Sequence, residues 1–116
     1  MKVKLIRRAS VEAFIALNAK SRSSMLAFLA LLKVAEWNVP EDIKSTFGKR
    51  VDIVCNGSRV VFDIGGGNYR IICGVSFGIK SVFLFIKFIG THAEYDKLCK
   101  ARKNETGICN VDLYRS

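Results

Sequence analysis

KSVFLFIKFIGTHAEYDKL, residues 80–98, is the stretch that decides the fold of this chain. Residues 81–89 form a largely apolar run, too long for a surface strand and far short of the roughly 20 residues needed to cross a membrane. We therefore predict the central strand of a sheet. Gly90 is expected to break the strand, and Thr91-x-x-Glu94 has the pattern of a capping box, whose side chains bind the first N–H groups of a helix. The strand should run directly into a helix.

Three chemically useful side chains lie across this predicted junction. Lys87 is in the strand, His92 is the only histidine of the chain, and Tyr95 follows it three residues later. Residues three apart share one face of a helix. The sequence therefore places one basic group and two candidates for proton transfer in a single corner.

Length and charge limit what this corner can belong to. A chain of 116 residues predicts one domain with one hydrophobic core. Its 19 Lys and Arg residues against 10 Asp and Glu give a formal net charge of +9 and a pI near 9.7. Such a field attracts nucleic acid, an anionic membrane or an acidic protein, although a basic surface that serves only solubility remains an alternative.

The four cysteines predict no metal site. Cys55, Cys73, Cys99 and Cys109 form no C-x-x-C pair, and a single histidine cannot complete a usual zinc set with them. Cys73 falls in an apolar strand and is read as a small hydrophobic residue. We expect no disulfide framework, because the core looks sufficient without one, and a reducing cytoplasm fits this use of cysteine.

No membrane segment is expected. The N-terminus MKVKLIRR is basic, but the residues that follow include Glu12 and Asn18 and so lack the apolar centre of a signal peptide. The apolar run at residues 25–32 is too short to span a bilayer. We expect a soluble, cytoplasmic protein without a membrane partner.

The remaining pattern predicts an α+β fold. We expect helices at residues 11–19, capped by Ser10, at 25–35, and from Pro40 to about residue 47. Strands are expected at residues 2–6, 51–54, 59–64 and 68–77, with turns at Asn56-Gly57, at the triglycine 65–67 and near Gly78. The prediction is N-terminal helices on one face of an antiparallel sheet of about four strands, with a short C-terminal helix. The wide apolar face of residues 25–35 fits burial in this core or contact with a partner.

Alternation along the strands separates two faces of the sheet. One face is predicted to be the core: Val60, Phe62, Ile64, Tyr69, Ile71, Cys73 and Val75. The other is predicted to be open, polar and basic: Arg59, Val61, Asp63, Asn68, Arg70 and Ser76. In the last strand, Lys87 shares a face with Phe83 and Phe85, whereas Leu84, Ile86 and Phe88 form the more apolar set. Lys87 is therefore expected beside Arg70 on the open face.

Four segments then carry a resemblance to a known family: Trp37 with PEDIK at residues 40–44, RVVFDI at 59–64, NYRI at 68–71 and FIGTHAEYDK at 88–97. In this order they resemble the HigB-type toxins of bacterial type II toxin–antitoxin modules, in the RelE-like superfamily. The resemblance covers residues 1–100, taken as a single RelE-like toxin domain, and leaves residues 101–116 as a C-terminal tail.

This resemblance implies a small ribonuclease that cuts mRNA, commonly on the translating ribosome, and is silenced by a cognate antitoxin, expected to be a helix-turn-helix protein. The chain departs from the family pattern where Asp63 replaces a frequent Asn, where no Lys accompanies residues 65–67, and where Lys87 replaces Arg. A carboxylate on the open face and a lost positive charge predict weaker phosphate binding.

The chemistry of metal-free RNA cleavage assigns a role to each candidate. The 2′-hydroxyl must lose a proton, the pentacoordinate phosphate must be stabilised, and the departing 5′-oxygen must gain a proton. Arg70 can hold phosphate oxygens bidentately and Lys87 adds a point charge. His92 is the candidate general base or acid, because a helix start disfavours imidazolium, and Tyr95 either transfers a proton or stacks on a base. No metal or cofactor is called for.

Other interpretations stay open at this point. A histidine at a helix start can simply bind backbone, and an arginine on a sheet face can simply be solvated. The same face, with Arg59, Asn68 and Lys80 as expected RNA contacts, also fits a module that binds RNA or the ribosome without cutting. A third hypothesis is a scaffold whose basic face only meets an acidic antitoxin.

Overall fold

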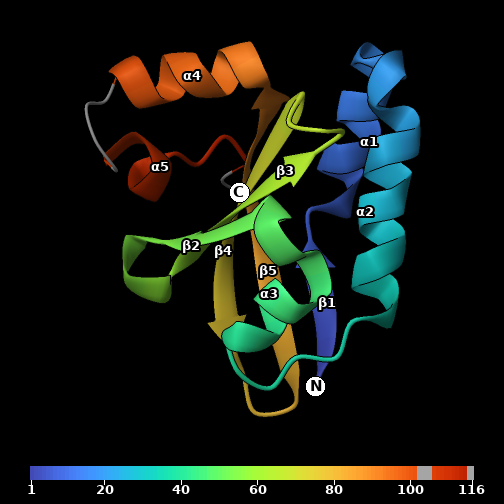
Figure 1. Cartoon of the computed structure of the whole chain (residues 1–116), viewed down its shortest axis with the longest axis vertical. Helices are drawn as coiled ribbons and strands as arrows, with labels where there is room; N and C mark the ends of the chain where they lie inside the picture. Colours follow the sequence, from blue (N-terminus) through green and yellow to red (C-terminus); the bar gives the residue numbers. More distant parts are fainter. Residues whose placement is uncertain (102–105, 115–116) are drawn as a thin grey trace.

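The computed structural model describes residues 1–101 and 106–114. Within them lies one five-stranded mixed sheet of order β1-β5-β4-β3-β2 (Figure 1). Its strands are β1 (Lys2–Ile6), β2 (Val51–Val54), β3 (Arg59–Ile64), β4 (Tyr69–Phe77) and β5 (Ser81–Thr91). The strand positions agree with the sequence prediction within two residues.

The strand count and one pairing differ from the prediction. β1 joins the sheet parallel to β5, with Lys2 opposite Ser81, whereas the other neighbours pair antiparallel. The sheet therefore has five strands and is mixed, and the predicted antiparallel sheet of about four strands is corrected. A parallel pair needs a long crossover, here through helices, and alternation within β1 carries no information about such a distant partner.

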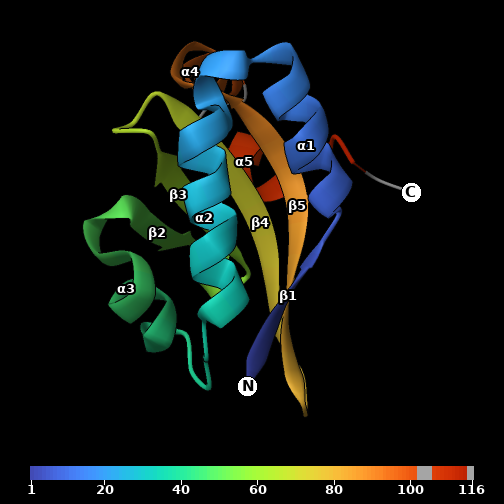
Figure 2. The same cartoon turned by 90° about the vertical axis from the view of Figure 1, so that its right-hand side faces the viewer.

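The N-terminal helices cover one face of the sheet, as predicted (Figure 2). They are α1 (Arg8–Leu17), α2 (Arg22–Val34) and α3 (Glu41–Phe47). The inner side of α2 is buried against the strands through Met25, Phe28, Leu29 and Leu32. Most of the wide apolar face of this helix therefore belongs to the core of this protein, while Leu26 stays 44% exposed.

Two predicted helix starts were wrong. α1 begins at Arg8, so Ser10 lies inside it, and the capping position is Arg7, which has φ 78° and makes no side-chain cap. The reason is that β1 ends only two residues earlier and the chain turns sharply there, which fixes the helix start without a cap. α2 begins at Arg22, so the polar run before Met25 forms its first turn.

A bulge in β5 reverses the alternation of its side chains. Ile86 pairs with Cys73 and Phe88 pairs with Ile72, so Lys87 has no opposite residue on β4. An extra residue of this kind shifts all later side chains to the other face. Val82, Leu84 and Ile86 therefore join the helix-side core, but Phe88 is buried on the opposite face, which corrects its predicted place.

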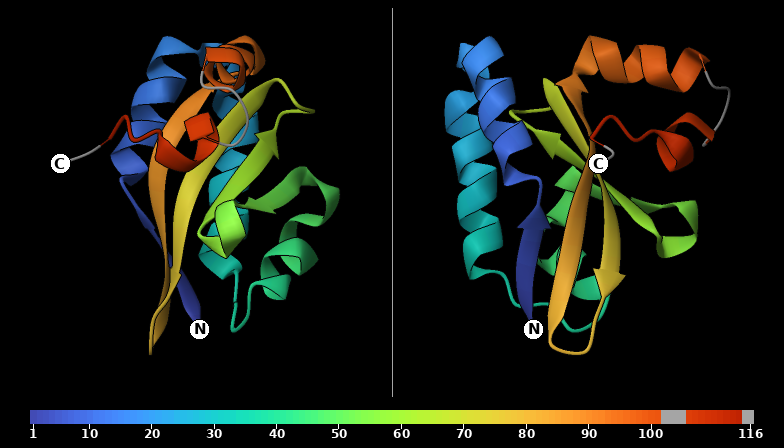
Figure 3. Two further views of the ribbon diagram at one scale, coloured as in Figure 1. Left: turned by 90° about the vertical axis from the view of Figure 1, so that its left-hand side faces the viewer. Right: turned by 180° about the vertical axis from the view of Figure 1, so that it is seen from behind.

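The second face of the sheet is not open. α4 (His92–Ala101) and α5 (Thr106–Asn110) lie over it, on the side away from α1 and α2 (Figure 3). Val61, Ile72 and Phe88 are buried there against Leu98, Ile108 and Val111. The predicted open face is therefore corrected: its polar and basic residues surround a second, smaller apolar cluster that the two helices cover.

A disulfide joins Cys55, in the β2–β3 turn, to Cys109 in α5. The absence of disulfides predicted from the sequence was wrong. The two cysteines are 54 residues apart, and the pairing depends on the C-terminal segment crossing the sheet, which spacing does not reveal. Cys73 is fully buried in the core, as expected of a small hydrophobic residue. In the described ranges, no helix is both long and apolar enough to cross a membrane.

Candidate active site

The junction of β5 and α4 forms the predicted capping box. The Thr91 N–H donates to Glu94 Oε1 at 2.8 Å, and the Glu94 N–H donates to Thr91 Oγ1 at 3.2 Å. Gly90 does not break the strand as predicted, since β5 runs on to Thr91. A Cβ at Gly90 would lie 2.6 Å from Phe88 Cζ, so glycine is needed for close packing rather than for a turn.

Arg70 lies beneath this junction, opposite Gly90 on β5 and opposite Asp63 on β3. Its Nε is 2.8 Å from Asp63 Oδ1, and its Nη1 donates to the carbonyl oxygen of Gly67 in the triglycine turn. The Arg70 side chain is only 14% exposed. The guanidinium is thus held in one orientation by a carboxylate and a turn.

Tyr95, on α4, packs against the same guanidinium. The Arg70 Cζ lies 5.4 Å from the centroid of the Tyr95 ring, which is a cation–π distance. The Tyr95 ring also packs against the Phe88 ring, with 6.5 Å between the two centroids. Burial raises the pKa of Tyr95 to about 12, with the neighbouring Cys99 adding to the shift. The phenol therefore keeps its proton at neutral pH and acts as a hydrogen-bond donor or acid rather than as a base.

His92 is the first residue of α4 and is exposed at the edge of this corner. Its Nε2 lies 3.4 Å from Asp96 Oδ2, one turn along the helix. Its backbone N–H donates to the carbonyl oxygen of Asn68, whose side chain is exposed after the triglycine turn. The structure therefore brings together four sequence-predicted residues: Asn68, Arg70, His92 and Tyr95.

Lys87 and Arg59 form a separate cluster. Both flank Gly74 of β4: Arg59 is its cross-strand partner, and a Cβ at Gly74 would lie 3.5 Å from Lys87 Cε. Gly74 is four residues, or about 13 Å, along β4 from Arg70. Lys87 shares the face of Arg70 as predicted, but the expectation that it lies beside Arg70 was wrong, because the bulge turns it toward the C-terminal segment.

Lys87 and Arg59 both already have partners in the C-terminal segment. The Lys87 Nζ contacts Asp112 Oδ2 at 3.1 Å, and Arg59 Nη1 donates to the carbonyl oxygens of Ile108 and Val111. Phe85, 38% exposed, lies under the ammonium with its centroid 5.9 Å from Lys87 Nζ. Asp112 could not be predicted as a partner, because its segment shows neither periodicity nor a motif.

Lys80 is not part of either cluster. It is exposed in the turn before β5, whereas His92 follows the other end of this 11-residue strand. A strand of that length separates the two residues by about 35 Å. Within residues 1–101 and 106–114, no group of three or more His, Cys, Asp or Glu side chains is placed to hold a metal ion.

Comparison with known proteins gives two matches. A family model described as "HigB_toxin, RelE-like toxic component of a toxin-antitoxin system" matches residues 21–98. The protein named mRNA interferase HigB from Escherichia coli O6:H1 is 33% identical over 70 residues, which are 60% of this chain and 66% of that relative. The chain thus spans just under two thirds of this curated relative. Arg70, Lys87, His92 and Tyr95 lie inside the family match, whereas α5 lies beyond it.

Proposed function

Because the chain belongs to the HigB family of RelE-like toxins, we propose that it is an endoribonuclease that cleaves mRNA without a metal ion. The observation that carries the proposal is the convergence of Arg70, His92 and Tyr95 at the β5–α4 junction. A phosphate ligand, a proton-transfer group and a protonated phenol meet there at the edge of a basic face. These are the functions that metal-free RNA cleavage requires.

Each residue then takes one step of the reaction. Arg70 binds the phosphate oxygens and stabilises the charge that grows on the pentacoordinate phosphorus. His92, held by Asp96, removes the proton of the 2′-hydroxyl. Tyr95, whose pKa is raised to about 12, keeps its proton for the departing 5′-oxygen or for a hydrogen bond to the phosphate. Asn68, exposed beside the triglycine turn, contacts the neighbouring nucleotide.

Partners and setting follow from the family and remain part of the proposal. The substrate is mRNA on the translating ribosome, attracted by the net charge of +9. A cognate antitoxin of the helix-turn-helix class silences the toxin, and the two meet in the cytoplasm.

Expression of this chain alone in bacteria tests the proposal. We expect growth arrest and shortened mRNA, and cleavage in a translating extract that survives EDTA once the magnesium requirement of the ribosome is controlled for. Arg70→Ala should abolish all of these effects. Unaltered growth at confirmed soluble expression would count against a nuclease, and rescue of chelated enzyme by added metal at the catalytic step would refute the mechanism.

A second candidate is an RNA- or ribosome-binding module with little catalysis. The Arg70–Asp63 ion pair favours it, because the carboxylate occupies the side chain that would hold the scissile phosphate. Salt-sensitive retention of RNA without cleavage would support this alternative. Cleavage by the wild-type chain would exclude it.

A further inference from the structure

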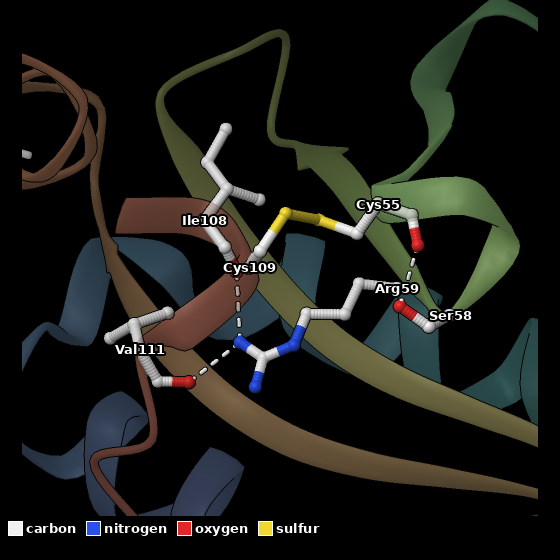
Figure 4. The surroundings of a disulfide bond; sticks show 6 residues. All are labelled: Cys55, Ser58, Arg59, Ile108, Cys109 and Val111. Atoms are coloured by element: carbon white, nitrogen blue, oxygen red, sulfur yellow. Dashed lines mark hydrogen bonds between the residues drawn. A yellow bond between two sulfur atoms is a disulfide. The ribbon is translucent and has the colours of Figure 1, made fainter. Parts of the chain in front are cut away.

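The segment of residues 106–114 lies across the second face of the sheet, and we call it the C-terminal strap. It contains α5, returns from α4 and is joined to the β2–β3 turn by the Cys55–Cys109 disulfide (Figure 4). Both cysteines are partly exposed. The strap lies beyond the family match, so it is an addition to the part of the chain that carries the proposed catalytic residues.

The strap occupies Arg59 with backbone carbonyl oxygens. Arg59 Nη1 donates to Ile108 O at 2.8 Å and to Val111 O at 2.6 Å, both drawn in Figure 4. An arginine on the RNA-facing side of a sheet would otherwise hold phosphate oxygens with these same donors. The strap therefore takes the place of a phosphate at this residue.

It occupies Lys87 in the same way. Asp112 Oδ2 accepts a hydrogen bond from Lys87 Nζ at 3.1 Å, and the Leu113 N–H donates to Lys87 O at 2.8 Å. The other carboxylate oxygen, Asp112 Oδ1, is buried and has no hydrogen-bond partner among the described residues. Together, the Asp112 and Leu113 contacts hold the strap against Lys87.

Apart from the disulfide, the strap is held by its polar contacts with Arg59 and Lys87 and by a small apolar area. α5 has five residues, too few for a helix that is stable by itself. The apolar contacts of the strap are those of Ile108 and Val111 with the cluster around Phe88 and of Tyr114 with the main core. Because a disulfide restricts the open ensemble, breaking it favours release of the strap from these contacts.

We propose that the strap is a redox-controlled inhibitor of RNA binding, closed when Cys55 and Cys109 are joined and open when they are reduced. The inference rests on the proposed function, since it regulates the same RNA-binding face. Opening frees Arg59 and Lys87, about 13 Å along β4 from Arg70 and beside Phe85, which is already 38% exposed. The added contacts are two cations for phosphates, beside one aromatic ring for a base.

The chemical step is thiol–disulfide exchange with a protein or small-molecule dithiol. A thiolate of the reductant attacks one sulfur of the Cys55–Cys109 bond, which forms a mixed disulfide and frees the other cysteine. The second thiol of the reductant then attacks its own sulfur in the mixed disulfide and releases the remaining cysteine. Two electrons and two protons pass to the cysteines, and the dithiol becomes a disulfide. A protein disulfide that meets a reducing cell interior is usually transient and redox-sensing, which fits this assignment.

The test measures binding of a labelled single-stranded RNA to the full chain, oxidised or treated with dithiothreitol. Reduction should tighten binding by at least about tenfold. Cys109→Ser should bind like the reduced protein with or without dithiothreitol. Arg59→Ala should weaken RNA binding of the reduced protein, because it removes one of the two cations that opening frees for phosphates. Lys20→Ala, on the opposite side of the sheet, controls for the loss of one positive charge.

Asp112→Asn gives a variant that keeps the disulfide and needs no reductant. It should tighten RNA binding of the oxidised protein, and backbone exchange at residues 107–113 should rise in both this variant and the reduced wild type. Equal RNA affinity and equal exchange in the oxidised and reduced states would overturn the proposal and leave the disulfide a purely structural link.

The outcome for the strap can be distinguished from the outcome for the proposed nuclease activity. A redox-dependent affinity without cleavage in either state would support the strap and refute the enzyme. Cleavage by the wild type, with equal RNA affinity in the oxidised and reduced states, would support the enzyme and refute the strap.

Discussion

Asp63 and Arg70 face each other across β3 and β4, with the carboxylate Oδ1 2.8 Å from the guanidinium Nε. The residue best suited to hold a phosphate is therefore already paired with a negative charge of the same chain. In the proposed reaction, RNA competes with this carboxylate for Arg70. The pair would then set the balance between ready cleavage and weak binding of RNA.

Asp63→Asn should shift this balance toward RNA. Asparagine keeps the shape and a hydrogen-bond acceptor but removes the negative charge, so RNA affinity and single-turnover cleavage should rise several-fold. Loss of the partly exposed ion pair should lower the free energy of unfolding by about 1 kcal/mol or less, measured in urea. Glu12→Gln on α1 removes one negative charge far from Arg70, and an equal gain in that control would show that only the net charge matters.

His92→Gln should separate binding from proton transfer. The variant should keep its fold by circular dichroism and its RNA affinity, but lose on the order of a hundredfold in single-turnover cleavage, the usual scale for a general base. Cleavage at the wild-type rate would reduce His92 to a helix-start residue and move the proton chemistry elsewhere.

Tyr95→Phe should retain the ring that stacks on Arg70 and delete only the proton donor. A large loss in cleavage at unchanged RNA affinity would identify the hydroxyl as the acid, whereas a small one would identify a packing role. Because the pKa of Tyr95 is raised to about 12, its ionised form stays minor well above neutral pH. The pH–rate profile of the wild type should therefore show no fall due to this group between about pH 7 and 10.

The Lys87–Asp112 contact should make the stability of the protein depend on acid. The hydrogen bond from Lys87 lowers the pKa of Asp112 below its ordinary value of 3.8. As pH falls, Asp112 therefore takes up its proton at a higher pH in the unfolded chain than in the folded protein. The stabilising effect of the Lys87–Asp112 contact is thus full above about pH 4 and is lost as pH falls through the lower pKa of the folded state.

Urea unfolding of the wild type and Asp112→Asn from pH 7 to pH 3 measures this effect. The difference should be about 1 kcal/mol near neutral pH and shrink below about pH 4. A difference that is constant over the whole range would mean that Asp112 acts through packing instead of charge.

The sequence could predict what depends on neighbours along the chain. The capping box of Thr91 and Glu94 is a local pattern, and so is the β2–β3 hairpin, and both are present in the structure. That His92 and Tyr95 lie together followed from a strand that enters a helix at once, but the basic group predicted beside them was Lys87, and Arg70 stands there in the structure. These features need only short-range geometry, which residue spacing encodes.

What depends on distant contacts was missed. The bulge at Lys87 is a single extra residue that leaves no mark on composition, yet it moves Phe88 to the other face and turns Lys87 away from Arg70. The partner of Cys55 and the contacts of Arg59 come from a tail that has no periodic pattern. Their positions follow from the packing of the whole chain, which single-residue patterns do not specify.

The parallel pairing of β1 with β5 has a consequence for the order of events during synthesis. Lys2 pairs with Ser81, so β1, which leaves the ribosome before the other strands of this sheet, has no place in it until the last of them, β5, has emerged. The β5–α4 junction, with His92 and Tyr95, follows directly after that strand. Closure of the sheet and assembly of the proposed active site are therefore nearly simultaneous, and a nascent chain should stay inactive until β5 and α4 have emerged.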